Sequence, residues 1–152
     1  MDDLLIVRPA IRADCEDIYR VHVDAVRGLP AGTQGKDGIE KWLLTREPTV
    51  YAEEMQKELM VIAEEDGELL GWGAFCSEKE QITNVFVDPV HHRRGVGTAI
   101  VTVLEDAARH ADLDSVQLQA TGTAIDFYLA IGYQSDPPVK PSAEWALMKK
   151  AL

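Results

Sequence analysis

Two apolar runs flank the dipeptide Asp66-Gly67, and this arrangement restricts the fold more than any other feature of the sequence. The runs "ELMVIAEE" and "ELLGWGAFC" each have the length and apolar content of a β-strand. An Asp-Gly pair readily adopts the left-handed backbone of a tight two-residue turn, so the pattern predicts a β-hairpin. Gly71 and Gly73 would weaken an ordinary strand, and they predict a bulge or the close approach of another backbone there.

Before the hairpin, a strand-like run, "LLIVRPA", is followed by a helical pattern. Asp14 is a suitable N-cap and Gly28 a suitable stop, so we expect a helix between them. His22 borders the apolar face of this helix, where a packed core histidine is more common than a functional one. Two short helices should follow, one around Trp42 and one after Pro48. The expected buried stripe of the first helix contains Ile18, Val21, Ala25 and Val26.

After the hairpin, strands and helices alternate. The strand-like run "ITNVFV" stops at Asp88-Pro89, and apolar residues recur at helical spacing from Ile100 to Ala111. The alternating run "SVQLQA" predicts the next strand. We therefore expect a strand, a helix and a second strand in this part of the chain.

The C-terminal part predicts one more helix and one more strand. Thr123 would begin the helix, with Asp126 completing an approximate capping box. Gly132 would end it in a left-handed conformation, so that Tyr133 packs back against the helix. With the final run "AEWALMKK" as a strand, the order is β-α-α-β-β-β-α-β-α-β. This order predicts a single α/β domain over residues 1–152, with a mixed β-sheet flanked by helices.

The charge of the chain excludes several classes of partner. Asp and Glu number 26 against 15 Lys and Arg, which gives a formal net charge of −11. An acidic protein is repelled by nucleic acid and by anionic membranes, so we expect neither partner. The start, "MDDLLIVRPA", is acidic and too short for a signal peptide, and no apolar run is long enough to span a bilayer. Cys15 and Cys76 lack zinc-type spacing, and we expect two reduced thiols in a cytoplasmic protein.

Against this acidic background, the stretch "VDPVHHRRGVGTAI" gathers basic side chains and glycines at the start of a helix. A helix N-terminus offers unpaired N–H groups, and glycine lets an anion approach them, so a phosphate site is one interpretation. A solvated basic patch is the other. The stretch is neither a P-loop nor a good dinucleotide fingerprint, because Ile100 stands where a third small residue is needed. We expect no metal site, since His91 and His92 are adjacent and no carboxylate or cysteine stands at ligand spacing from them.

Together with "SVQLQA", "TAIDFYLAIGY" and the hairpin, this stretch resembles the GNAT superfamily of acetyl-CoA-dependent N-acetyltransferases, over roughly residues 59–133. The pyrophosphate loop of that family reads Arg/Gln-x-x-Gly-x-Gly/Ala. Three positions depart from the family pattern: His92 replaces Arg or Gln, Thr121 or Thr123 replaces an Asn, and Gln81 replaces a Glu. Aligned on its glycines, the loop is filled by His92, Arg93, Arg94, Gly95, Val96 and Gly97.

The resemblance implies where acetyl-CoA, as co-substrate, would bind. Its pyrophosphate would rest on the backbone amides from His92 to Thr98, with Thr123 at the contact position of the later helix. Its pantetheine arm would lie along the strand segment Val85, Phe86 and Val87. The amide of Val87 would face the thioester carbonyl and stabilise the oxyanion that forms there.

The resemblance also implies catalytic residues. Tyr128 matches the tyrosine that protonates the departing thiolate; the alternative is a ring that only packs, next to Phe127. Glu80 is the candidate general base, with Glu78 as a second candidate, and either could act through a water molecule. Both glutamates could instead simply solvate a turn, and some amines could bind already deprotonated.

These expectations combine into one function and one rival. The function is a cytoplasmic acetyltransferase that moves an acetyl group from acetyl-CoA to a primary amine of a small molecule or peptide. Direct attack in a ternary complex is expected, because neither cysteine lies in a recognised motif. The rival is a non-catalytic acyl-CoA-binding or interaction domain with the same fold; Tyr128 favours the enzyme and Gln81 the rival. A homodimer is possible. The acidic residues Asp37, Glu40, Glu47, Glu53 and Glu54 either attract a cationic amine or form a solvated face.

Overall fold

The computed structural model describes residues 4–33, 35–91, 95–140 and 143–152. Its elements agree with the predicted ones: the helix between Asp14 and Gly28 and the two short helices around Trp42 and after Pro48 all form, so three α-helices, one more than in the predicted order, separate the first two strands. In chain order, the elements are β1 (Leu5–Pro9), α1 (Cys15–Arg27), α2 (Lys36–Leu44), α3 (Val50–Glu54), β2 (Leu59–Glu65), β3 (Glu68–Cys76), β4 (Gln81–Val87), α4 (Val96–His110), β5 (Ser115–Thr121), α5 (Ile125–Ala130) and β6 (Trp145–Ala151). Two 3-10 turns, Arg12–Asp14 and Pro89–His91, precede α1 and follow β4.

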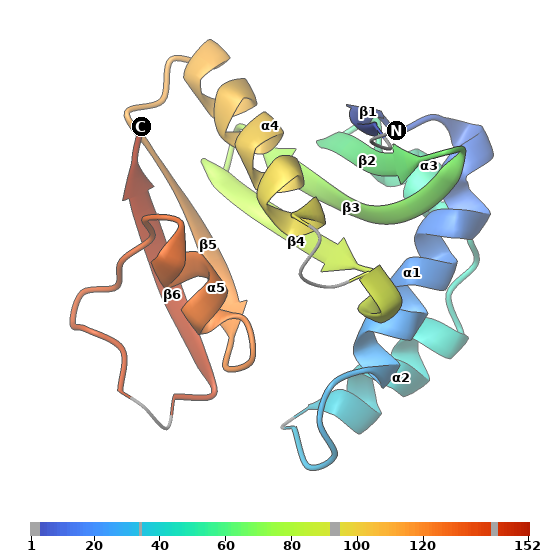
Figure 1. Ribbon diagram of the computed structural model, residues 1–152, viewed down its shortest axis with the longest axis horizontal. Coiled ribbons are helices and arrows are strands. Elements are labelled where there is room, and N and C mark those ends of the chain that lie inside the picture. The colour runs from blue at the N-terminus through green and yellow to red at the C-terminus, as the bar shows by residue number, and fades with distance from the viewer. Residues whose placement is uncertain (1–3, 34, 92–94, 141–142) are drawn as a thin grey trace.

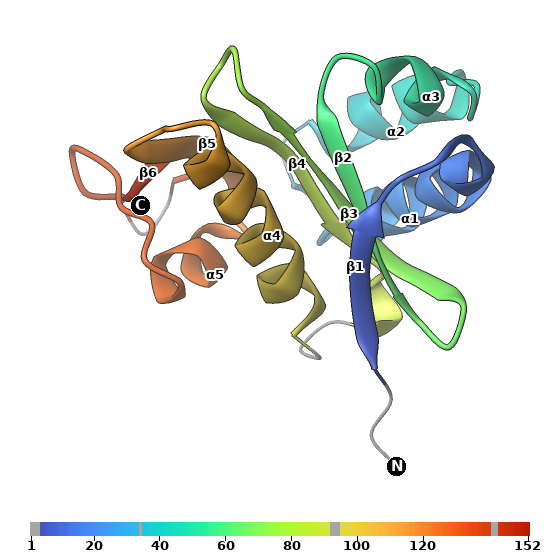
Figure 2. The same cartoon turned by 90° about the horizontal axis from the view of Figure 1, so that it is seen from above.

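The strands form one six-stranded sheet in which their order in space is their order in sequence. Every neighbouring pair is antiparallel except β4 and β5, which are parallel, so the predicted mixed sheet is confirmed. Helices α4 and α5 lie on one face and α1 to α3 on the other (Figures 1 and 2). Each face has its own buried cluster, one under α4 and α5 and one between α1, α3 and the β2–β3 hairpin. This arrangement is the α/β fold that the sequence predicts.

The hairpin forms as expected, with positive φ angles of 53° at Asp66 and 79° at Gly67. The β2–β3 ladder contains a bulge between Ala63 and Glu64. A Cβ atom at Gly73 would lie 2.6 Å from Ile100 Cγ2 and 3.0 Å from the Asn84 carbonyl oxygen. The bulge beside Gly71 confirms one of the two predicted features, and the close backbone at Gly73 is that of β4, while glycine there also lets the side chains of α4 pack directly on the hairpin.

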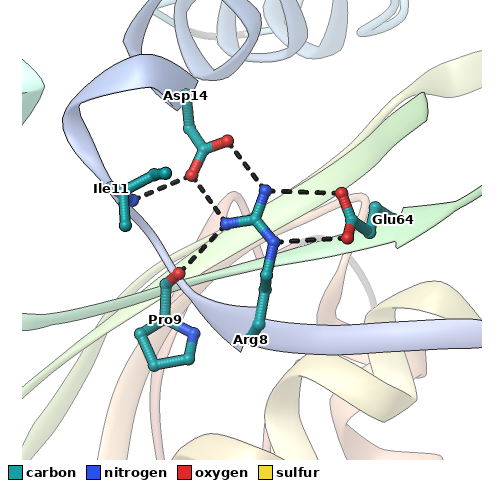
Figure 3. Close-up of polar contacts among 5 residues, drawn as sticks. All are labelled: Arg8, Pro9, Ile11, Asp14 and Glu64. Atoms are coloured by element: carbon teal, nitrogen blue, oxygen red, sulfur yellow. Dashed lines mark hydrogen bonds and ion pairs between the residues drawn. The ribbon is translucent and has the colours of Figure 1, made fainter. Parts of the chain in front are cut away.

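Helix α1 begins after Asp14 and ends at Gly28 as predicted, but the Asp14 side chain makes no capping bond to this helix. Asp14 has near-helical φ and ψ angles of −84° and −10°, and its carboxylate turns back to accept the Ile11 amide at 2.8 Å. It also accepts two bonds from the Arg8 guanidinium, at 2.9 and 3.0 Å, while Arg8 binds Glu64 at 3.2 and 3.3 Å (Figure 3). Asp14 therefore ties β1, β2 and the start of α1 together. Of the predicted stripe, Ala25 is only half-buried, whereas Ile18, Val21 and Val26 are buried.

The start of α5 also differs. This helix begins at Ile125, its N-cap is Ala124, and no side chain caps it. The chain first makes a turn in which the Ala124 amide donates to the Thr121 carbonyl at 2.8 Å, so the helix starts later than Thr123 and Asp126 suggested. The end is as predicted: Gly132 has a φ of 103°, and the fully buried Tyr133 donates its amide to the Tyr128 carbonyl at 3.0 Å.

Candidate functional site

Strands β4 and β5 pair at one point and then diverge. Gln81 and Gln117 are their one registered pair among the described residues, and the Gln117 amide donates to the Glu80 carbonyl at 3.2 Å. On its other side β4 stays paired with β3 as far as Val87, opposite Gly71. In Figure 1 the two strands separate toward their C-terminal ends. The later part of β4 thus has one edge without a partner strand.

The pattern of hydrogen bonds tells which amides face this free edge. The Asp88 amide donates to the Leu70 carbonyl at 2.8 Å, on the β3 side. Residues of an antiparallel strand alternate between the two edges, so Phe86 also faces β3. The amides of Val85 and Val87 consequently point to the side from which β5 has diverged. An extended chain could pair with them there as an additional strand.

The N-terminus of α4 lies beside the same end of β4. Gly95 precedes the helix with a φ of 77°, and among the described residues, apart from its chain neighbours, no atom lies within 4 Å of where its Cβ would stand. The Ala99 amide donates to the Gly95 carbonyl at 3.0 Å, so the amides of Val96, Gly97 and Thr98 precede the first helical bond and have no hydrogen-bond partner among the described residues. The positive end of the helix dipole also favours an anion at this place. His92, Arg93 and Arg94, predicted to belong to this loop, lie outside the described residues.

Gly97 shows which elements meet at the site. A Cβ atom there would lie 3.2 Å from Phe127 Cζ and 3.7 Å from Val87 Cγ2. The first turn of α4, the end of β4 and helix α5 therefore come together around this glycine. Of the predicted strand and loop residues, the structure brings Val87 and Gly97 together, and it adds Phe127, which the sequence had suggested only as a packing neighbour of Tyr128.

Tyr128 is the titratable group that α5 carries to this region. It is buried, and its ring packs against Phe127 and Tyr133 with centroid distances of 5.0 and 5.6 Å. Burial raises the pKa of its hydroxyl to about 12, so the phenol stays protonated at neutral pH. No hydrogen bond joins this hydroxyl to another described side chain. The group is therefore suited to donate a proton and unsuited to act as a base.

Glu80 and Glu78 lie elsewhere. Both are exposed, in the turn before β4, and Glu80 has a positive φ of 54°. From Gln81 to Val87 the strand rises by roughly 20 Å, at about 3.3 Å per residue. Glu80 is therefore at the closed end of the β4–β5 pair, whereas the free amides are at the open end. Its role as a general base stays a prediction, and it would need water molecules to carry the proton.

The remaining predicted residues, Thr123 and His22, add no reactive group to the site. Thr123 is exposed, and its hydroxyl oxygen lies 3.3 Å from that of Thr121. His22 is buried and stacks on Phe86 with a centroid distance of 4.3 Å, as expected of a core histidine. Burial, with a smaller contribution from the nearby Arg46 charge, lowers the pKa of His22 to about 4, so its imidazole is neutral.

Two kinds of feature are absent from the described residues. Among the side chains at described positions, no group of three or more His, Cys, Asp or Glu residues could hold a metal ion. In the same part of the chain, no helix has the length and apolar character needed to cross a membrane.

The sequence has relatives among known acetyltransferases. A family model described as acetyltransferase (GNAT) domain matches residues 30–148. GCN5-related N-acetyltransferase 2, chloroplastic, from Arabidopsis thaliana is 36% identical over 56 residues, which are 37% of this chain and 22% of that protein. The uncharacterized protein YdhI from Bacillus subtilis is 30% identical over 73 residues, which are 46% of each chain. The chain thus spans less than half the length of these two relatives.

Solved structures match over nearly the whole chain. A GCN5-related N-acetyltransferase from Rhodopseudomonas palustris has a TM-score of 0.83 at 23% identity and covers 100% of this chain and 99% of its own. The PaiA N-acetyltransferase from Thermoplasma acidophilum, solved in complex with coenzyme A, has a TM-score of 0.81 at 15% identity, covering 98% and 99%. These likenesses show the fold, and the family model extends over well over half of the sequence. The chain therefore belongs to the GNAT family of acetyltransferases.

Proposed function

We propose that this protein transfers the acetyl group of acetyl-CoA to a primary amine by direct attack in a ternary complex. The observation that carries the proposal is the unpaired edge of β4 beyond the Gln81–Gln117 pair, next to the free amides of α4. An extended arm ending in a pyrophosphate needs both features, a strand edge to pair with and an anion site at one end of it. GNAT membership supports acetyl transfer in general terms, and the acceptor and the mechanism are our proposal.

The residues present fit the co-substrate. At Gly95 the space where a Cβ would stand is open, so a phosphate group can approach the backbone closely. The amides of Val96, Gly97 and Thr98 would donate to its oxygens, and His92, Arg93 and Arg94 of the preceding loop would add positive charge. Thr123, beyond the end of β5, would contact the arm from the other side. Acetyl-CoA supplies an acetyl group activated as a thioester.

Two groups of the chain would act on the reacting atoms. The Val87 amide, which points to the free edge beside Val85, would donate to the carbonyl oxygen as negative charge develops there. The Tyr128 hydroxyl would then give its proton to the departing sulfur. A phenol with a pKa near 12 is a weak acid for this task, but the same buried surroundings also raise the proton affinity of the thiolate. The proton would therefore pass along the hydrogen bond from the phenol to the sulfur as the carbon–sulfur bond breaks, and water would return a proton to Tyr128.

Direct attack is favoured over an acetyl-cysteine intermediate because of where the thiols lie. Both Cys15 and Cys76 are buried, at the start of α1 and at the end of β3. Burial also raises the pKa of the Cys15 thiol, which lowers its fraction of reactive thiolate. Neither cysteine adjoins the amides of Val87 or Gly97 in the fold. The amine itself is thus the nucleophile, and Glu80 could accept its proton only through water.

We infer an amine acceptor on a small molecule or a peptide, without nucleic acid or membrane as partner. The acidic residues of the α2–α3 region define the amine acceptor only in part, because two of them already have basic partners. Glu40 accepts from Arg27 at 2.9 Å, and Glu54 pairs with Arg46. Asp37, Glu47 and Glu53 are the members of this acidic set that could attract a cationic amine. A cytoplasmic location and a homodimer complete the proposal.

The proposal is tested by following thiol release from acetyl-CoA with a panel of acceptors: an alkylamine, a polyamine, an amino sugar and a peptide with a free α-amino group. Mass spectrometry should find the acetylated product of at least one of them. Tyr128→Phe should slow single-turnover release by roughly 10²–10⁴ while coenzyme A affinity changes little, since the hydroxyl acts mainly in the transition state. Coenzyme A binding without turnover on any amine would support the rival, a non-catalytic acyl-CoA-binding domain.

A further inference from the structure

A charged hydrogen-bond network lies next to Tyr128. Glu105, in the middle of α4, is only 5% exposed, although it carries a carboxylate. The Tyr133 hydroxyl donates to its Oε2 atom at 2.8 Å, and Lys150 Nζ lies 3.2 Å from Oε1 and 3.1 Å from Oε2. A buried carboxylate is stable only with such partners. The network therefore joins α4, the turn after α5, and β6.

Tyr133 connects this network to Tyr128 by two contacts. The two rings pack edge to face, with a centroid distance of 5.6 Å and an interplanar angle of 75°. The Tyr133 amide also donates to the Tyr128 carbonyl at 3.0 Å. Burial, and next its bond to Glu105, raise the pKa of the Tyr133 hydroxyl, so it remains a donor at neutral pH. Glu105 thus fixes the orientation of the Tyr133 ring through the Tyr133 hydroxyl. The same ring packs against the ring of Tyr128.

The position of α5 relative to α4 depends on this link. Since β4 and β5 have one registered pair in the described part of the chain, the sheet ladder alone does not set where α5 stands relative to α4. Helix α5 has only six residues and no side-chain cap, so its own stability is low. The distance from Tyr128 to the first turn of α4 consequently depends on side-chain contacts between α4 and the β5–β6 side.

We propose that Glu105 and Tyr133 are positioning residues: together with Lys150 they hold Tyr128 at the distance from the α4 turn that proton donation requires. The inference rests on the proposed function, in which Tyr128 is the acid. A displacement of about 1 Å in a reacting group can cost on the order of 10²-fold in rate, so a partial loss of positioning should be measurable. In this proposal Glu105 and Tyr133 act through Tyr128 and not on the co-substrate.

The first test uses Tyr133→Phe, which keeps the ring and removes the bond to Glu105. Single-turnover thiol release from acetyl-CoA, with the fastest amine of the panel, should slow by about tenfold while coenzyme A affinity stays the same. In a Tyr128→Phe background the same substitution should have no further effect, because it acts through the Tyr128 hydroxyl. Ile18→Val, a loss of one buried methylene in the cluster on the other face of the sheet, is the control and should leave turnover unchanged.

The second test needs no co-substrate. With ring-labelled tyrosine, the NMR resonance of Tyr128 is assigned by its absence in Tyr128→Phe. It should shift or broaden in Tyr133→Phe and in Glu105→Gln, and stay in place in Ile18→Val. An unmoved Tyr128 resonance, normal turnover of Tyr133→Phe, or fully multiplicative losses in the double variant would each overturn the inference. Near-normal turnover of Tyr128→Phe would overturn the proposed function along with it, so the two failures are distinguishable.

Discussion

The contact between Gly73 and α4 makes a prediction whose magnitude follows from the structure. In Gly73→Ala the new methyl group would stand 2.6 Å from Ile100 Cγ2 and 3.0 Å from Leu104 Cδ1, against an optimum near 3.5–4.0 Å for carbon pairs. The clash involves branched side chains of a packed core, where overpacking typically costs about 1–3 kcal/mol. Reduced freedom of the unfolded chain offsets about 0.4–1 kcal/mol of this. We expect a net loss of about 1–2 kcal/mol in the free energy of unfolding.

Thermal and urea unfolding measure this effect. For a chain of this size, such a loss lowers Tm by roughly 2–8 °C. Gly38→Ala is the matched control: Gly38 lies within α2, and no atom stands within 4 Å of its Cβ position, so the variant should gain about 0.5–1 kcal/mol from helix propensity. Adding Ile100→Leu, which removes the clashing Cγ2 branch, should restore part of the loss. Wild-type stability of Gly73→Ala would refute the close packing of α4 on the hairpin.

Three further predictions concern the ligand, acid stability and nucleic acid. Substituting Val for both Gly95 and Gly97 should abolish most of the thermal stabilisation by coenzyme A, because Gly95 has a positive φ and a side chain at Gly97 would meet Phe127. The control Glu78→Gln should bind coenzyme A normally. Equal affinities of the two variants would contradict the anion site. Burial raises the pKa of Asp14, but the bonds from Arg8 and the Ile11 amide outweigh it and hold this pKa below its ordinary value. The stabilisation by Asp14 should thus be complete above its unfolded pKa of about 3.9 and be lost as the pH falls through the lower folded pKa. In urea unfolding, Asp14→Asn should have a lower free energy of unfolding than the wild type at pH 7, and this difference should shrink in acid. A difference that does not depend on pH would argue against the ion pair. At physiological salt the protein should not shift duplex DNA in a gel, given its formal charge of −11, and salt-sensitive retention would disprove this.

Local signals predicted the parts of the fold that local chemistry decides. Asp66-Gly67 marked the hairpin turn, Gly71 and Gly73 marked the close approach, and Gly132 marked the end of α5, because each of these needs a residue type that few others can replace. The glycines of the loop before α4 predict an anion site, which stays a prediction.

Caps were predicted less well, because a capping side chain can find a better partner elsewhere. Asp14 binds Arg8 and the Ile11 amide in place of the first turn of α1, and a turn inserted after Thr121 delays the start of α5. Arg8 is only six residues from Asp14, but Arg8 is itself held by Glu64, 56 residues further along the chain, and this contact the local sequence does not reveal.

The family resemblance pointed to the loop before α4, the strand segment 85–87 and Tyr128, and the roles of these residues stay predictions. The divergence of β4 from β5 leaves no trace in either strand, since both read as ordinary strands until the register is known. The Glu105–Tyr133–Lys150 network was equally hidden, because a glutamate on a helix normally lies in solvent and its two partners come from later parts of the chain. Long-range pairing of this type needs the fold, and the sequence pattern alone does not contain it.

The central claim is that coenzyme A pairs with the free edge of β4 and ends at the first turn of α4. Hydrogen–deuterium exchange with and without coenzyme A tests it directly, and β1 provides an internal control as the strand at the other edge of the sheet. We predict that coenzyme A slows exchange at the amides of Val85 and Val87 and in the segment 96–98, while Leu5–Pro9 exchanges at an unchanged rate. Binding of coenzyme A with no slowing at Val85 and Val87 would contradict the account.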